Sequence, residues 1–231
     1  MREKKVKLVK VEIWSDFVCP WCWIAKRRFE SVAKALAEEI QVAPTYKSYR
    51  LSPGMVPTGF KAALAKKFGS ARAAEELMAT VSKQAALDGL IYNFSNMKFG
   101  DTTDVHALVK SVASPTLQGL LIDRVFHAYI SEGFNIFDRA VLQEIALQSG
   151  ILSEQVDLDL YESIAAIERE EAEATRITGG VPLFVFNSKF VLSGAQPIEV
   201  FEQVLRRAAE ESLATVTVAN AGVCESEGCR I

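Results

Sequence analysis

The sequence has little of several features that assign a chain to well-known classes of protein. Its 231 residues contain no run of about 18 apolar residues that would span a membrane. The formal net charge of −3 offers no excess of positive charge of the kind that binds nucleic acid. Only two histidines and four cysteines are present, so ligands for a transition metal are few. We therefore expect neither a membrane protein nor a nucleic-acid-binding protein.

The first residues also lack the pattern of a secretory signal. Residues 1–10 are rich in lysine and lead into alternating apolar and charged residues, not into an apolar segment with a small-residue cleavage site. On this ground we expect a cytoplasmic protein. In a reducing compartment, cysteines placed as close pairs are more often catalytic or redox-sensing than structural.

The first cysteine pair is Cys19-Pro20-Trp21-Cys22, which follows an alternating apolar run and precedes a helical pattern. Proline suits the first position of a helix because it has no N–H to leave unpaired. A helix that begins at Pro20 places Cys19 at its mouth and Cys22 one turn further on the same face. The positive end of the helix dipole then favours a thiolate at Cys19. A CxxC between a strand and a helix predicts a thioredoxin-like redox motif.

Two other interpretations of this pair stay open from the residues alone. One is half of a zinc site, but zinc wants four ligands and the only other cysteines, Cys224 and Cys229, lie at the far end of the chain. The other is a pair of buried structural cysteines. The Pro-Trp insert and the strand-to-helix context favour redox chemistry, so we expect no metal and no organic cofactor.

The chain order indicates an α/β domain interrupted by helices. An alternating strand over residues 9–13 is followed by a helix to about Leu36 and an extended stretch over 42–51, where Pro44 suggests an edge strand or a bulge. Residues 60 to about 178 have helical composition throughout. Two short β segments around Asn187-Ser188 then predict a hairpin, followed by a helix over 197–211.

This order predicts four parts. They are a first part of the α/β domain over 1–59, an all-helical insertion over 60–178, a second part over 179–211 and a tail over 212–231. Within the insertion, Ser114-Pro115 and Asp138 have the pattern of helix N-termini. The two histidines, His106 and His127, fall inside helical patterns without metal-ligand spacing, which favours packed or surface histidines.

Three motifs together resemble the DsbA-like branch of the thioredoxin fold, and within it the FrnE-type oxidoreductases, in the superfamily that also holds 2-hydroxychromene-2-carboxylate isomerases. They are Ser15-Asp16 ahead of Cys19-Pro20-Trp21-Cys22, the stretch 180–184 around Val181-Pro182, and the stretch 191–197. Their order and spacing fit from the first strand to about residue 210. The resemblance implies a thioredoxin-like fold with a large helical insertion.

The resemblance also implies roles for single residues. Cys19 would be the attacking thiol, Cys22 the resolving thiol, and Val181-Pro182 a cis bond that faces them. Pro20, Trp21, Val181 and Pro182 would contact substrate. An extended substrate strand would pair with the Val181 backbone. From the residues alone, an ordinary trans proline in a loop stays open.

The sequence departs from the family pattern at two places. Leu183 stands where threonine is expected after the proline, and Asp101-Thr102 stands where the helical domain often carries Asn-Thr. These differences bear on substrate preference and leave the dithiol in place.

The second cysteine pair, Cys224 and Cys229, lies in a segment without helical periodicity. The resemblance implies an auxiliary dithiol that exchanges disulfides with Cys19 and Cys22. The neighbouring glutamates disfavour thiolates there, which would make this pair an electron donor rather than a first attacker. The alternative is a tail whose thiols have no role.

Three functional hypotheses follow. The first is a dithiol–disulfide oxidoreductase or isomerase with protein thiols and disulfides as substrates, and with glutathione as a further partner. The second is a glutathione-dependent isomerase of small aromatic compounds, a class that typically does not keep both thiols. The third is a non-enzymatic holdase that binds unfolded chains.

Overall fold

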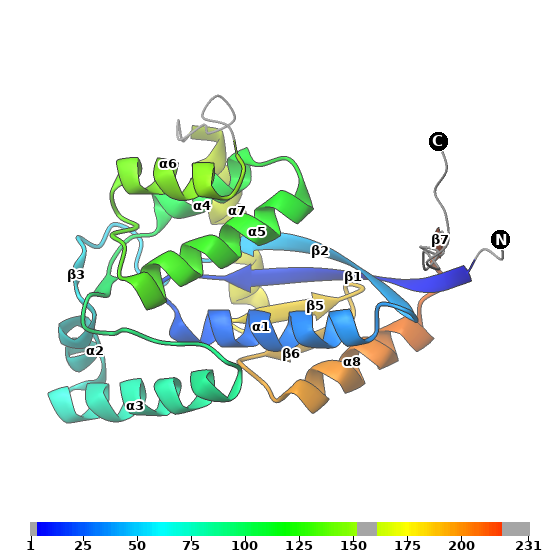
Figure 1. Ribbon diagram of the computed structural model, residues 1–231, viewed down its shortest axis with the longest axis horizontal. Coiled ribbons are helices and arrows are strands. Elements are labelled where there is room, and N and C mark those ends of the chain that lie inside the picture. The colour runs from blue at the N-terminus through cyan, green and yellow to red at the C-terminus, as the bar shows by residue number, and fades with distance from the viewer. Residues whose placement is uncertain (1–3, 152–160, 219–231) are drawn as a thin grey trace, which may run out of the picture.

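A mixed β-sheet forms one half of the protein in the computed structural model, which describes residues 4–151 and 161–218 (Figure 1). The central strand β1 (Lys4–Ser15) pairs in parallel with β2 (Ile40–Ser48) and antiparallel with β5 (Leu183–Phe186). β5 continues through a turn at Asn187-Ser188 into β6 (Phe190–Ser193), so the predicted hairpin is confirmed. β2 lies at an edge of the sheet, as Pro44 predicts.

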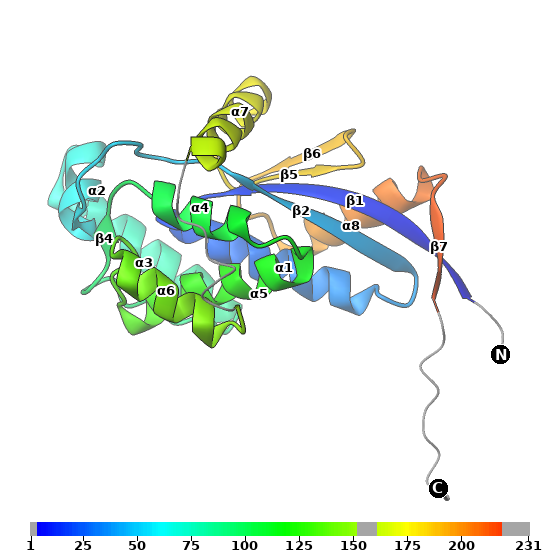
Figure 2. The ribbon, with the colours of Figure 1, turned by 90° about the horizontal axis from the view of Figure 1, so that it is seen from above.

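Both faces of the sheet are covered by helices because its strands place apolar side chains on both sides. Helices α1 (Pro20–Ala35) and α8 (Ile198–Glu210) pack through residues such as Phe29 and Phe201 on the face formed by alternate residues of β1 and β5. The opposite face carries Trp14 and Leu183, which pack against α7 (Tyr161–Ile177). Figure 2 shows α7 and α1 on opposite sides of the strands.

In the described part of the segment between β2 and β5, the regular structure is helical except for one short β pair. A two-residue strand, β3 (Thr58–Gly59), pairs with β4 (Lys98–Phe99), so the prediction of an all-helical insertion is wrong at this point. The other elements of the insertion besides α7 are α2 (Phe60–Phe68), α3 (Ala71–Leu87), α4 (Thr103–Ser111), α5 (Pro115–Phe126), the π-helix η1 (His127–Glu132) and α6 (Arg139–Gln148). Among the described residues, no helix is both long and apolar enough to cross a membrane.

The predicted N-caps inside the insertion are present. Ser114 accepts a hydrogen bond from the N–H of Leu117, and Asp138 accepts one from the N–H of Ala140. Each side chain satisfies a donor that the helix itself leaves free. A third cap at Ser70 separates α2 from α3.

Helices α2 to α6 gather at the end of the sheet where β1 finishes (Figure 1). At the other end of β1, the last described strand, β7 (Thr215–Val218), pairs with residues Lys4 to Lys7. The carboxyl end of β1, and the start of α1 that follows it, are therefore enclosed by the insertion.

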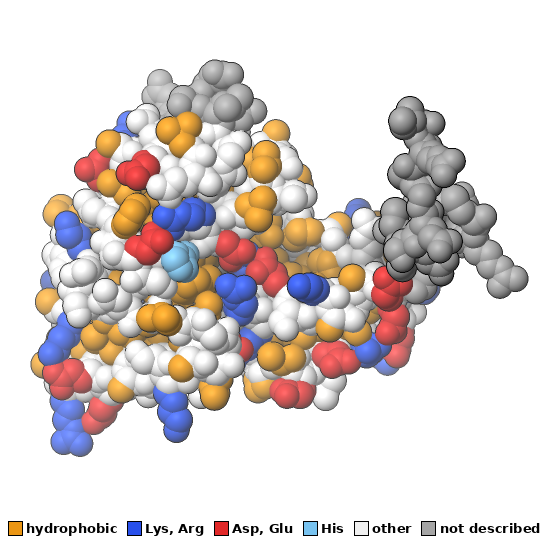
Figure 3. Space-filling view, in the orientation of Figure 1, with side chains coloured by type: hydrophobic (Ala, Val, Ile, Leu, Met, Phe, Trp, Pro, Cys, Tyr) orange, Lys and Arg blue, Asp and Glu red, His pale blue; other side chains and the backbone are white. Residues whose placement is uncertain are grey.

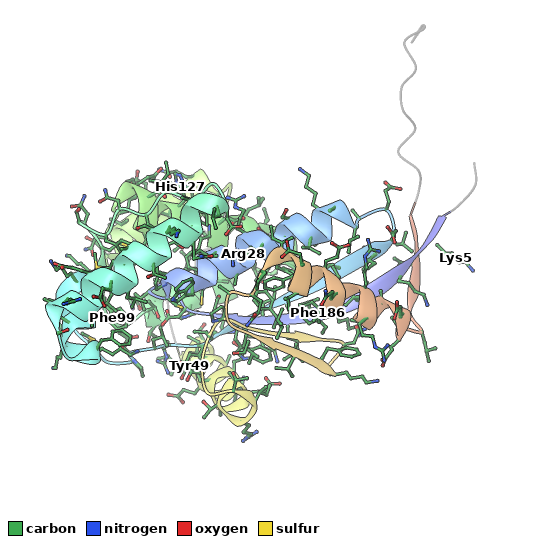
Figure 4. The ribbon with its side chains drawn as sticks, turned by 90° about the horizontal axis from the view of Figure 1, so that it is seen from below. Lys5, Arg28, Tyr49, Phe99, His127 and Phe186 are labelled. Atoms are coloured by element: carbon green, nitrogen blue, oxygen red, sulfur yellow. The ribbon has the colours of Figure 1, made fainter. Side chains whose placement is uncertain are left out.

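Arg28 joins the insertion to the sheet domain. Its guanidinium donates to the Asp88 carboxylate at 2.8 Å, to Gln84 at 3.1 Å, and to the Ala195 and Gln196 carbonyls at 3.0 and 3.2 Å. Figure 4 shows Arg28 between α1 and α3. One buried cation thus holds the first helix, the insertion and the segment after β6 in a fixed arrangement.

Candidate functional site

The dithiol lies at the mouth of α1, as the sequence predicts. The helix begins at Pro20, and Cys19 is its N-cap with extended backbone angles. The Cys19 N–H donates to the Asp16 carbonyl at 3.1 Å, and the Cys22 N–H donates to the Cys19 carbonyl at 3.1 Å. Both cysteines are free thiols, and both are buried, with 5% and 1% of their surface exposed.

The loop before β5 lies against Cys19, the cysteine expected to attack. The Val181–Pro182 peptide bond is cis, the isomer that the resemblance implies. The Cys19 thiol donates to the Val181 carbonyl over 3.8 Å, and the Pro182 carbonyl accepts from the Gly194 N–H at 2.8 Å. Residues some 160 positions apart in the chain therefore meet at one point.

The insertion supplies the other side of the site. The Tyr92 hydroxyl donates to the Pro20 carbonyl at 2.6 Å, which ties the first turn of α1 to the loop after α3. Trp21 is partly exposed and packs at the rim, whereas Trp23 is buried against Tyr92 and Phe126. Trp21 therefore presents more surface to a substrate than Trp23 does.

Exposed apolar side chains lie on the insertion near α3. Leu87 at the end of that helix and Ile91 in the following loop are 73% and 75% exposed. Figure 3 shows hydrophobic side chains gathered on this side of the molecule, between α3 and α5. They form part of a surface that an apolar polypeptide can contact.

A buried carboxylate lies close to the dithiol, on the residue whose carbonyl accepts the Cys19 N–H. Asp16 is fully buried, and its two oxygens accept hydrogen bonds from the Thr102 hydroxyl at 2.7 Å and from the Leu51 N–H at 2.6 Å. The Nε2 atom of His106 lies 3.6 Å from the same carboxylate. Asp16, Thr102 and His106 come from two parts of the chain, β1–α1 and the insertion.

The sequence does not identify this polar group as functional. The helical pattern around His106 predicts a packed or surface histidine, and the structure shows it buried with its ring against Phe17. The signal available in the sequence is Asp16 itself, a charged residue between the apolar residues Trp14 and Phe17. Nothing local to His106 indicates which carboxylate it meets.

Burial dominates the electrostatics at Cys22. Removal of water raises the pKa of the Cys22 thiol well above its usual range, and Cys19 raises this pKa further. A hydrogen bond with the Asp16 backbone lowers the pKa of Cys22 by more than the Asp16 carboxylate raises it. Burial likewise raises the pKa of Tyr92. At neutral pH, Cys22 in the reduced pair is therefore a protonated thiol beside a neutral phenol.

Two of the predicted site residues cannot be placed. Cys224 and Cys229 lie outside the described residues. Within residues 4–151 and 161–218, no cluster of three or more histidine, cysteine, aspartate or glutamate side chains has the geometry to hold a metal ion.

Comparison with known proteins gives a family match over most of the chain. Residues 10–206 match the family model described as DSBA-like thioredoxin domain. The uncharacterized protein YwbO of Bacillus subtilis (strain 168) is 26% identical over 206 residues, which are 85% of this chain and 96% of that protein.

Solved structures share the fold over nearly the whole chain. A probable DsbA oxidoreductase from Streptomyces coelicolor superposes with a TM-score of 0.80 at 30% identity, covering 96% of this chain and 99% of the other. The cytosolic disulfide reductase DsbM from Pseudomonas aeruginosa, determined with GSH, has a TM-score of 0.63 at 18% identity, covering 86% and 98%. At 18% identity, the similarity to DsbM shows a shared fold alone.

Proposed function

Because this chain belongs to the family of DSBA-like thioredoxin domains, we propose that it is a thiol–disulfide oxidoreductase, of the FrnE type, that acts on protein disulfides through Cys19 and Cys22. The observation that carries this proposal is the position of two free thiols at the mouth of α1, with the Val181 carbonyl 3.8 Å from the Cys19 sulfur. Within residues 4–151 and 161–218, neither thiol is bonded to another cysteine or lies in a cluster of metal ligands.

The reaction proceeds in two exchanges that move two electrons from the enzyme to the substrate. The Cys19 thiolate attacks a substrate disulfide, so that a Cys19–substrate bond forms, the substrate S–S bond breaks and one substrate thiolate leaves. Cys22 then loses its proton and attacks the Cys19 sulfur. The Cys19–Cys22 disulfide forms, and the second substrate sulfur leaves as a thiolate that takes up a proton.

Substrate binding follows from the same geometry. The backbone of Val181 lies beside Cys19, so an extended substrate segment that pairs with it brings its own cysteine to the attacking sulfur. The partly exposed Trp21 and the exposed Ile91 offer apolar contacts to neighbouring substrate residues. This surface supports protein chains as substrates. Glutathione is the monothiol that we propose returns the oxidised pair to its reduced form.

The test is insulin reduction with glutathione as the reductant, followed for the wild type and for Cys19→Ser and Cys22→Ser. We expect turnover by the wild type and background rates for both variants. Cys22→Ser retains the attacking thiol, so it should accumulate a covalent enzyme–substrate adduct that a non-reducing gel resolves. Cys19→Ser should form none.

Other outcomes would favour the competing functions. If Cys19→Ser reduced insulin as fast as the wild type, the proposal would be overturned. Suppression of aggregation by wild type and Cys19→Ser alike, without any reduction, would indicate a holdase. Glutathione-dependent isomerisation of a small aromatic compound, without insulin reduction, would indicate an isomerase.

A further inference from the structure

The stretch 191–197, one of the three motifs that carry the family resemblance, takes no part in the two exchange steps. It does contact the loop that contains the cis bond. Its Gly194 N–H donates to the Pro182 carbonyl at 2.8 Å, immediately beside that bond. One residue further along, Leu183 of β5 pairs with Ser193 of β6. The position of the cis-proline loop therefore depends on the position of this stretch.

Arg28 of α1 binds the two residues that follow Gly194. A single guanidinium nitrogen, Nη1, donates to the Ala195 carbonyl at 3.0 Å and to the Gln196 carbonyl at 3.2 Å. The guanidinium is planar and permanently charged, so its hydrogen bonds fix the direction of its acceptors as well as their distance. The segment after β6 is thereby attached to α1.

The other nitrogens of the same guanidinium face the insertion. Nε donates to the Asp88 carboxylate at 2.8 Å, and Nη2 donates to the Gln84 side chain at 3.1 Å. Asp88 is the C-cap residue of α3, and the side chains of Arg28 and Asp88 are only 8% and 6% exposed. Separating a buried ion pair leaves an uncompensated charge, so this pair holds the end of α3 against α1.

We propose that Arg28 and Asp88 are positioning residues, through which the helical insertion holds the Val181 backbone in place for pairing with an extended substrate. They act on Val181 through Gly194 and Pro182. Within the described chain, none of the hydrogen bonds of Arg28 reaches a thiol. Strand pairing weakens steeply when donor and acceptor are misaligned. The inference rests on the proposed function, and it separates the affinity for polypeptides from the reactivity of the dithiol.

Lys26, two positions earlier in α1, offers a matched comparison. Its ammonium lies 2.8 Å from the Asp123 carboxylate of α5 and 2.5 Å from that of Glu30, and its side chain is 4% exposed. Lys26 is therefore also a buried cation that joins α1 to a carboxylate of the insertion. Its described hydrogen bond goes to Glu30 and not to the stretch 191–197. Its replacement should lower stability and leave the cis-proline loop in place.

The test compares a protein disulfide with a small one. Reduced enzyme is mixed with insulin or with bis(2-hydroxyethyl) disulfide, which is too short to pair with the Val181 backbone. Alkylation at successive times, followed by mass spectrometry of the peptide that contains Cys19 and Cys22, gives the rate constant for oxidation of the dithiol. The ratio of the two rate constants reports the contribution of strand pairing.

Arg28→Lys keeps a cation beside Asp88 but cannot reach all four acceptors at once. We expect its rate constant with insulin to fall about tenfold and its rate constant with the small disulfide to fall less than twofold. Asp88→Asn loosens only the link to the insertion, so its rate constant with insulin should fall about threefold. Lys26→Gln should leave the ratio of the two rate constants unchanged.

Three results would overturn the proposal: equal losses with both disulfides in Arg28→Lys, no loss with either, or the same selective loss in Lys26→Gln. If Arg28→Lys does not fold, Asp88→Asn carries the test with the same two rate constants. Failure of the proposed function is distinct from these results, because it would show as a wild type that does not react with insulin at all.

Discussion

The two halves of α1 pack in different surroundings. The first turns, with Cys22 and Trp23, lie in an apolar cluster shared with the insertion. Two polar residues, Asp16 and His106, are buried nearby, and the His106 ring lies against Phe17. The later turns, with Phe29, lie against the sheet and α8 in a cluster built from apolar side chains. Arg28 stands where the two surroundings meet.

The later turns of α1 therefore contribute mainly to folding stability, and its first turns mainly to the chemistry of the dithiol. Apolar burial against the sheet needs no polar partner and contributes directly to folding. The first turns instead enclose thiols, a carboxylate and an imidazole whose desolvation opposes folding unless each is paired. Substitutions in the later turns should therefore change stability, and substitutions in the first turns should mainly change reactivity.

The largest effect is expected for Phe29→Ala. The Phe29 ring is 3% exposed and lies 5.4 Å from that of Phe184 and 6.2 Å from that of Phe201, measured between centroids. Its removal leaves a cavity, which should lower the free energy of unfolding by about 3–5 kcal/mol. Urea unfolding measures this loss, and the rate of insulin reduction by the folded fraction should stay unchanged.

Phe68→Ala is the matched control. Phe68 is 51% exposed at the end of α2, so the same truncation should change the free energy of unfolding by less than about 0.5 kcal/mol. Equal losses for the two variants would contradict the assignment of the sheet-facing cluster as the main source of stability.

A smaller effect should separate two buried tryptophans. Trp14 on the sheet donates its indole N–H to the Glu170 carbonyl at 3.0 Å, and the Lys47 ammonium lies 4.5 Å from its ring centroid. The indole N–H of Trp23 is buried without a hydrogen-bond partner in the part of the chain that the structure describes. Replacement by phenylalanine removes a satisfied donor in one case and an unsatisfied donor in the other.

We therefore expect Trp14→Phe to lower the free energy of unfolding by about 1–2 kcal/mol more than Trp23→Phe does. The two substitutions remove the same atoms from sites of similar burial, so each serves as the control of the other. Urea denaturation followed by circular dichroism measures both. A larger loss for Trp23→Phe would show that packing at the dithiol outweighs the unpaired donor.

The sequence predicts most of the fold because its elements have local signals. The helix start at Pro20, the caps at Ser114 and Asp138, and the hairpin around Asn187-Ser188 each depend on a few adjacent residues. The strand β4 at Lys98–Phe99 was missed because two residues carry no periodicity, and its partner lies about forty positions earlier.

The site residues also differ in whether the local sequence indicates them. The dithiol was evident from its spacing, whereas Val181-Pro182 needed the family resemblance, since a proline alone does not indicate its isomer. The pairing of Asp16 with His106 joins positions ninety residues apart and depends on how the insertion docks. No local pattern encodes that contact.

The smallest effect is expected at the other end of β1. Val218 pairs with Lys4, so the described chain ends one full length of β1 away from Ser15, about 35 Å for its 12 residues. Cys224 follows Val218 by six residues, which span at most about 21 Å. While β7 stays paired, Cys224 cannot reach Cys19 of the same molecule, and Cys229 approaches it only when its eleven residues are fully extended, at about 38 Å.

Truncation after Val218 should therefore leave insulin reduction unchanged in dilute protein, where encounters between molecules are rare. If the tail dithiol does exchange with Cys19 and Cys22, it should do so between two copies of the chain, because the distance from Val218 to Cys19 limits only the tail of the same molecule. When protein with an oxidised Cys19–Cys22 pair is mixed with protein whose Cys224 and Cys229 are reduced, the rate of disulfide exchange should rise in proportion to protein concentration. An exchange rate independent of concentration would mean that β7 detaches and that the tail reacts with the Cys19–Cys22 pair of its own molecule.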